Sequence, residues 1–116
     1  MFKFEKLKIW QKSMDFAEEM SCLADEFPQK EMYNLSSQMR RASDSIALNI
    51  SEGSIEQSIP EFRRFLSYSI RSLAEVVTCL HKAQGRKYIS KIIFDKNYKE
   101  AYHLMNMMIA FKKTLA

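Results

Sequence analysis

Residues 35–53 read LSSQMRRASDSIALNISEG, the clearest amphipathic helix pattern in the chain. Its apolar side chains recur every three or four residues, which places them on one face of an α-helix. They form a single narrow stripe, made of Leu35, Met39, Ala42, Ile46, Ile50 and Gly53. A narrow apolar stripe on a polar helix is typical of a helix that packs on the core of a bundle. Gly53 is a residue that favours a left-handed helix end, so we expect the helix to stop there.

The residues around this stretch divide the chain into further helices. Ser58 can cap a following helix, Pro60 lies in its first turn where a missing N–H costs nothing, and Glu61 completes a capping box. Pro28 ends the preceding helix, because it disfavours helical backbone in the residue before it. Ser90 can cap a last helix. We therefore predict four helices, at about residues 5–27, 32–53, 59–84 and 90–113.

Length and composition predict how these helices are arranged. The 116 residues fit one domain, and only two Gly and two Pro leave little room for a turn-rich β architecture. Connections of about four to seven residues suit antiparallel neighbours. The predicted fold is all-α, a single-domain, up-down-up-down antiparallel four-helix bundle.

The first and last helices have apolar arcs that span about half of each circumference, wider than a bundle core usually needs. One interpretation is a broad core with some exposed apolar residues. The other is that one stripe faces the core and its neighbour faces a second subunit, since so large a patch is rarely left in water. The second interpretation favours a ring-forming homo-oligomer. Its candidate interface residues are Ile9, Phe16, Met20, Leu23, Tyr98, Tyr102 and Met105.

Charge and cysteine usage bound the partners and the compartment. The net charge is +4, which permits an acidic partner without requiring one. Cys22 and Cys79 are isolated, and the charged N-terminal residues MFKFEKLKIWQ do not form a signal peptide. The longest weakly polar stretch, near Tyr102–Phe111, is shorter than the roughly 20 residues that span a bilayer. We expect a cytoplasmic protein with reduced thiols and no membrane partner.

No residue pattern predicts catalysis or a bound metal. Glu100 and His103 have the Glu-x-x-His spacing of di-iron bundles, but such a site needs two of these motifs and two further carboxylates. The other histidine, His81, has Thr78 three residues before it. Cys22 lies among acidic residues, which do not favour a reactive thiolate, and no Gly-rich phosphate loop occurs. We expect no enzyme, no metal and no cofactor.

Polar residues of the second and third helices predict cross-helix pairs. In an antiparallel hairpin that turns near residue 56, Arg40 or Arg41 meets Glu75. In the same register Glu52 meets Arg63, while Asn49 lies at the margin of the apolar stripe. These residues are either ordinary pairs that fix the register or a polar site at a subunit junction. The predicted structural set is Arg40, Arg41, Asn49, Glu52, Arg63 and Glu75.

Basic residues also line up on these helices. Arg64, Arg71 and Lys82 fall within about 20° of one another on the third helix at 100° per residue, and Arg40 and Arg41 face outward on the second. Such a line is either a solvated face or a track for phosphates. These five residues are our candidates for binding RNA or another partner.

Landmarks along nearly the whole chain resemble one family. They include Phe4-Glu5-Lys6-Leu7, Phe27-Pro28, Tyr33-Asn34-Leu35, Gln38-Met39-Arg40-Arg41-Ala42, Asn49-Ile50, Glu52-Gly53-Ser54, Ser72-Leu73-Ala74-Glu75 and Tyr88-Ile89-Ser90. Read together, they resemble the 23S rRNA intervening-sequence proteins, a four-helix-bundle family sometimes labelled ribosomal protein.

The resemblance implies an up-down bundle that assembles as a ring, typically a homopentamer. Genes of the family are often found inside intervening sequences of bacterial ribosomal RNA genes, which implies a connection with RNA. The family is also similar to the accessory protein of diversity-generating retroelements, a basic pentameric barrel. Our leading hypothesis is a non-catalytic, ring-forming module that binds RNA or an RNA-handling protein. The alternative is a protein-interaction scaffold without nucleic-acid affinity.

Overall fold

The computed structural model describes residues 1–55 and 58–115. These residues form four α-helices: α1 (Lys8–Asp25), α2 (Leu35–Ile55), α3 (Ile59–Gly85) and α4 (Lys91–Thr114). Two short 3-10 helices, η1 (Lys3–Lys6) and η2 (Gln29–Glu31), precede α1 and α2. No strand occurs within the described ranges, so the predicted all-α class is confirmed.

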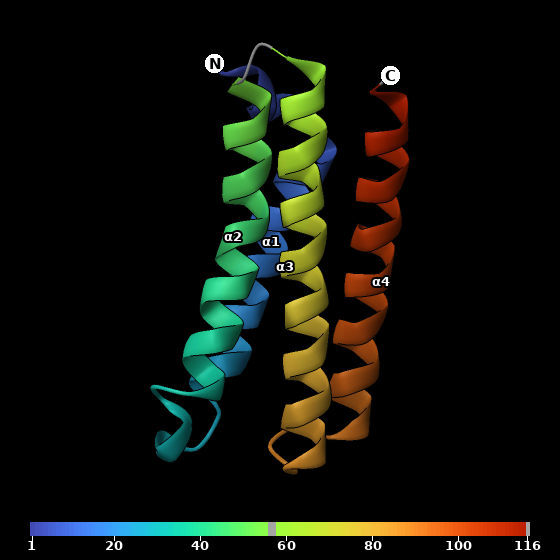
Figure 1. The fold of residues 1–116 in the computed structure, drawn as a ribbon. Helices are drawn as coiled ribbons and strands as arrows, with labels where there is room; N and C mark the ends of the chain where they lie inside the picture. Colours follow the sequence, from blue (N-terminus) through green and yellow to red (C-terminus); the bar gives the residue numbers. More distant parts are fainter. Residues whose placement is uncertain (56–57, 116) are drawn as a thin grey trace.

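The four helices run side by side along the long axis of the molecule (Figure 1). Both chain termini lie at the end where α2 finishes and α3 begins, and the other two connections lie at the opposite end (Figure 1). The molecule measures 44 × 24 × 22 Å along its principal axes. α2 packs closely on α1 and α3, whereas α4 packs mainly on α3 and more lightly on α1.

Two helices begin later than we predicted. α1 starts at Lys8 rather than residue 5, because residues 3–6 form η1 and Leu7 is extended with φ −77° and ψ 126°. It ends at Asp25 rather than residue 27. α2 starts at Leu35 rather than residue 32, since η2 occupies part of the connection. The turn that we placed near residue 56 lies outside the described residues.

Gly53 does not end α2, which continues to Ile55. The glycine is buried inside the helix and its φ is not positive, so a left-handed end is not its role. A Cβ built at Gly53 would lie 2.5 Å from the Cβ of Phe65. Glycine is therefore needed here because the α2 backbone approaches α3 too closely for a side chain.

The predicted caps of α3 and α4 are confirmed. The Oγ of Ser58 accepts a hydrogen bond from the Glu61 N–H, and the Oγ of Ser90 accepts one from the Ile93 N–H, both at 3.2 Å. The predicted capping box at α3 is only half formed. The Glu61 carboxylate, which we expected to bind the Ser58 N–H, pairs with Arg64 at 2.6 Å. That side chain stabilises the first turn by an i,i+3 ion pair instead.

The core corrects one of our predictions for α1. The four candidate interface residues Ile9, Phe16, Met20 and Leu23 are all buried within the single chain, in the same core cluster as residues from α2, α3 and α4. The first helix contacts two neighbours, α2 on one side and α4 on the other, and this explains its wide apolar arc. Leu7 and Trp10, from the adjacent stripe, are only partly buried against this cluster.

No described helix combines the length and the apolar character needed to span a membrane.

Candidate nucleic-acid interface

A polar groove of about 500 Å³ lies between α2 and α3. It brings together three residues that the sequence singled out: Arg41 from α2, and Glu75 and Lys82 from α3. Its remaining lining residues are small or uncharged, namely Gln38, Ala42, Ser45, Ser72, Thr78 and Cys79.

Hydroxyl groups form the contact between the two helices at this groove. The hydroxyls of Ser45 and Ser72 are hydrogen-bonded to one another at 2.6 Å. Beneath them, the buried Ser69 donates a hydrogen bond to the Ile46 carbonyl at 2.8 Å. Short side chains at these positions leave room for the groove, and their hydrogen bonds fix the height of one helix against the other.

The two cations of the groove are exposed. Arg41 and Lys82 have no carboxylate within ion-pair distance among residues 1–55 and 58–115. Arg40 is not part of the groove, because it forms an ion pair with Asp25 of α1. Our prediction that Arg40 could meet Glu75 is therefore wrong, since Arg40 lies on the α1 side of α2. Arg41 and Glu75 do line the same groove, but not within ion-pair distance.

The predicted pair between Glu52 and Arg63 is also wrong. Arg63 donates hydrogen bonds to the carbonyls of Lys112 and Leu115, both at 2.7 Å, because it lies on the α4 side of α3. A guanidinium group stabilises a helix C-terminus by binding carbonyls that have no partner in the helix. Asn49 is half-buried and donates to the Ser45 carbonyl within α2 at 2.9 Å.

The predicted basic line is exposed on α3. Arg64, Arg71 and Lys82 all face solvent, and Lys82 also lines the groove. The first and last of these cations are eighteen positions apart, about 27 Å at the rise of an α-helix. The ring of Tyr68 lies between the two arginines, with guanidinium carbons 5.9 Å (Arg64) and 5.8 Å (Arg71) from its centroid.

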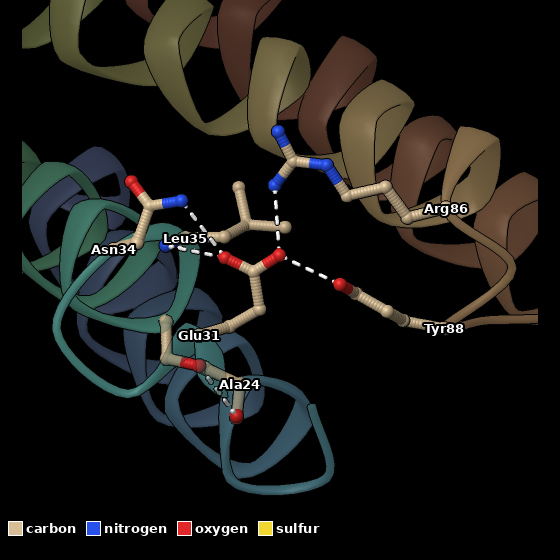
Figure 2. Close-up of polar contacts among 7 residues, drawn as sticks. Ala24, Glu31, Asn34, Leu35, Arg86 and Tyr88 are labelled. Carbon is tan, nitrogen blue, oxygen red and sulfur yellow. Dashed lines mark hydrogen bonds and ion pairs between the residues drawn. The ribbon is translucent and has the colours of Figure 1, made fainter. Parts of the chain in front are cut away.

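A second polar cluster surrounds the buried carboxylate of Glu31, which is only 5% exposed (Figure 2). One oxygen accepts hydrogen bonds from the Tyr88 hydroxyl at 2.6 Å and from Arg86 at 3.0 Å. The other accepts them from the Asn34 side chain at 2.9 Å and the Leu35 N–H at 3.4 Å. The hydrogen bond from Tyr88 is the main cause of the lowered pKa of Glu31.

The cluster joins the α1–α2 connection to the α3–α4 connection at the end of the molecule away from the termini (Figures 1 and 2). Our sequence analysis missed Glu31. The available signal was indirect, since Asn34 and Tyr88 both belong to the landmarks of the family resemblance. Because both of its oxygens accept hydrogen bonds, this carboxylate has the structural role of linking the two connections.

Acidic residues of α1 and α4 face one another across a second groove. The pKa of Glu19 is raised to about 7, first by a side-chain hydrogen bond with Glu100 and then by desolvation. His103 lines the same groove as both carboxylates. Nowhere in the described part of the chain do three or more His, Cys, Asp or Glu side chains form a group suited to a metal ion. Burial raises the pKa of the Cys79 thiol, while Cys22 is exposed.

An apolar surface covers the outer side of α3 and α4. It surrounds a shallow hollow of about 230 Å³ lined by Ala74, Val77, Tyr98, Ala101, Tyr102 and Met105. Tyr98 is 39% exposed and Tyr102 is 61% exposed. Two of the three candidate interface residues of α4 thus lie at the surface, unlike those of α1, while Met105 is partly buried against the core. We call this region the α3–α4 apolar surface.

The fold and these sites define an all-helical bundle with a cationic groove on one face and an apolar surface on another. The family described as 23S rRNA-intervening sequence protein matches residues 5–110, so the chain belongs to this family, as the sequence landmarks predicted.

The fold is similar to a crystal structure from Bacteroides thetaiotaomicron, described as a protein with unknown function from the S23 ribosomal protein family. The TM-score is 0.84 at 22% sequence identity, with 90% of this chain and 95% of the other covered. This likeness concerns the fold. No curated protein shows significant sequence similarity to the chain.

Proposed function

We propose that this chain is a non-catalytic module that binds RNA through the groove and exposed cations of α2 and α3. The observation that carries the proposal is the groove itself. It holds Arg41 and Lys82 among hydroxyl and amide groups and one carboxylate, Glu75, and neither cation has a carboxylate at ion-pair distance in the described ranges. Such cations can neutralise phosphates and release the counterions that surround them. Membership of a family named for an rRNA intervening sequence favours RNA as the polyanion.

Assembly strengthens this proposal. The bundle, with its helices in up-down-up-down order, forms a ring of identical subunits in the cytoplasm, and a pentamer is favoured. Five copies of a +4 chain carry about +20, so a groove that binds weakly alone becomes one of several linked sites. The α3–α4 apolar surface is the proposed contact between subunits. It shares no lining residue with the groove, so a neighbouring subunit can cover it and leave the groove open.

The first prediction tests the cations. Changing Arg64, Arg71 and Lys82 together to Ser should weaken RNA binding at low salt by about tenfold or more, because each lost phosphate contact removes counterion release. Fluorescence anisotropy with labelled RNA measures this effect. The matched control changes three exposed lysines of α1 and α4 to Ser, namely Lys12, Lys96 and Lys99.

Both triple variants alter the net charge equally, so only the position of the lost charge differs. Equal binding by the two variants would show that overall charge, and not this face, attracts the RNA. The second candidate function is a protein scaffold without nucleic-acid affinity, and the exposed tyrosines of the α3–α4 apolar surface favour it. That function would be supported if the unmodified protein bound no RNA at low salt.

A further inference from the structure

Tyr68 is held in a defined position on the exposed side of α3. Its ring packs edge-on against Phe65, with centroids 5.5 Å apart and an interplanar angle of 74°. Phe65 in turn lies directly against the backbone of Gly53 in α2. A half-buried aromatic ring fixed in this way loses little conformational entropy when a ligand contacts it.

Two guanidinium groups flank this ring. Their carbons lie 5.8 and 5.9 Å from the ring centroid, within the distance of a cation–π contact, so the cations and the ring form one cluster on α3. Arg71 has no ion-pair partner among residues 1–55 and 58–115, and Arg64 pairs only with the exposed Glu61 of the preceding turn. The ring therefore lies between two exposed cations, one of which also pairs with a carboxylate on its own helix.

We infer that α3 binds single-stranded RNA, with an unpaired base stacked on Tyr68 and the neighbouring phosphates held by Arg64 and Arg71. This inference rests on the proposed function and names its ligand class. In a duplex the faces of the bases are already stacked on one another, so only an unpaired base can reach an aromatic ring. Stacking on an aromatic ring tolerates any base, which suits a surface with no element that reads sequence.

The alternative is that the arginines and Tyr68 only stabilise α3 as neighbours one turn apart. The two possibilities differ in a measurable way. A stacking ring strengthens binding only when the strand carries bases, whereas a purely structural ring affects strands with and without bases alike.

The experiment compares three ligands of equal length by fluorescence anisotropy: a single-stranded RNA, the same strand with abasic positions throughout, and an RNA duplex. Tyr68→Leu keeps apolar contact with Phe65 but removes the aromatic face, and Tyr68→Phe keeps the face. Tyr33→Leu is the matched control, because Tyr33 is 91% exposed and lies in the α1–α2 connection. Circular dichroism and light scattering establish that each variant keeps its helix content and its mass.

The expected result is that Tyr68→Leu binds the base-bearing strand about tenfold more weakly and the abasic strand unchanged. Tyr68→Phe and Tyr33→Leu should bind like the unmodified protein. The salt dependence should not change in Tyr68→Leu, since tyrosine neutralises no phosphate. We also expect the unmodified protein to prefer the base-bearing strand over the duplex.

Two results would overturn the inference while leaving the proposed function intact. One is equal affinity of the unmodified protein for base-bearing and abasic strands, and the other is full affinity of Tyr68→Leu for the base-bearing strand. Absence of binding to all three ligands at low salt would overturn the proposed function and the inference together.

Discussion

Glu31 and Glu19 show how two carboxylates of one chain acquire opposite character from their neighbours. Glu31 is surrounded by donors from Tyr88, Arg86 and Asn34, which stabilise its charged form and lower its pKa. Glu19 faces Glu100, which destabilises its charged form and raises its pKa. The first carboxylate ties two connections together, and the second makes the α1–α4 seam sensitive to pH.

The Glu19 pair leads to a prediction about pH and stability. Its pKa of about 7 in the folded chain exceeds the ordinary value of 4.5, so the folded chain binds more protons between these values. The contribution of Glu19 to the free energy of unfolding therefore falls as pH rises from about 5 to about 8. Asp15 raises this pKa further and Lys96 opposes it.

Glu19→Gln should consequently increase the free energy of unfolding near pH 8 and have less effect near pH 5. The gain should be a few tenths of a kcal/mol, because Glu19 is exposed and solvent screens its interactions. Urea denaturation at both pH values measures it, with Glu18→Gln as the control on the same helix. An identical gain at the two pH values would contradict the account.

At the scale of the elements, the close approach of α2 and α3 is the feature that positions the groove. Gly53 permits this approach near one end of the pair, and the hydroxyls of Ser45, Ser72 and Ser69 hold it further along. Pairing of this kind fixes the register of the helices, and the register decides which cations share the groove.

Gly53→Ala should therefore lower the free energy of unfolding by about 1–3 kcal/mol, since the added Cβ would overlap Phe65. Gly85→Ala is the matched control. Nothing lies within 4 Å of a Cβ built at Gly85, so alanine should leave stability unchanged or raise it by up to about 1 kcal/mol. Urea denaturation of both variants measures the difference. Equal stability of the two variants would show that α2 and α3 can separate without cost.

Most elements of the fold follow from the sequence, and the misses have physical causes. Ser58 and Ser90 predict helix starts because a serine cap acts through its own local backbone. Gly53 misled the prediction, because a helix end and a close contact with another helix both select glycine, and only the neighbouring helix distinguishes them. Periodicity likewise identified the wide apolar arc of α1 but not what this arc packs against. A helix that packs on two helices of its own chain has the same apolar pattern as a helix that packs on its own core and on a second subunit.

The candidate site could be predicted only in part. Residue types and spacing indicated Arg41 and Glu75, because an antiparallel hairpin brings them to similar heights. They indicated Lys82 because it follows Arg64 and Arg71 along one line of α3. Arg40 and Arg63 found other partners, Asp25 on α1 and the carbonyls at the end of α4. Those partners belong to helices outside the hairpin, so the pairing rule for two helices does not include them.

At the scale of the whole molecule, the proposed function assigns binding to one surface of α3 and assembly to the other. The unmodified protein should have a mass of about five chains by light scattering, and Tyr102→Glu should reduce it, because a charge cannot be buried without a partner. Ile92→Glu is the control, since Ile92 is 82% exposed on the same helix and does not line the hollow of the apolar surface. A concentration-independent monomer for the unmodified protein would exclude the ring.

The central claim is that this bundle binds RNA by neutralising phosphates with its own cations. The most direct measurement is the affinity of the unmodified protein for RNA at a series of salt concentrations. We predict a linear fall of log K with log salt, with a slope of about −0.7 to −0.9 for each phosphate neutralised. Affinity that is absent at low salt, or that does not change with salt, would contradict the claim.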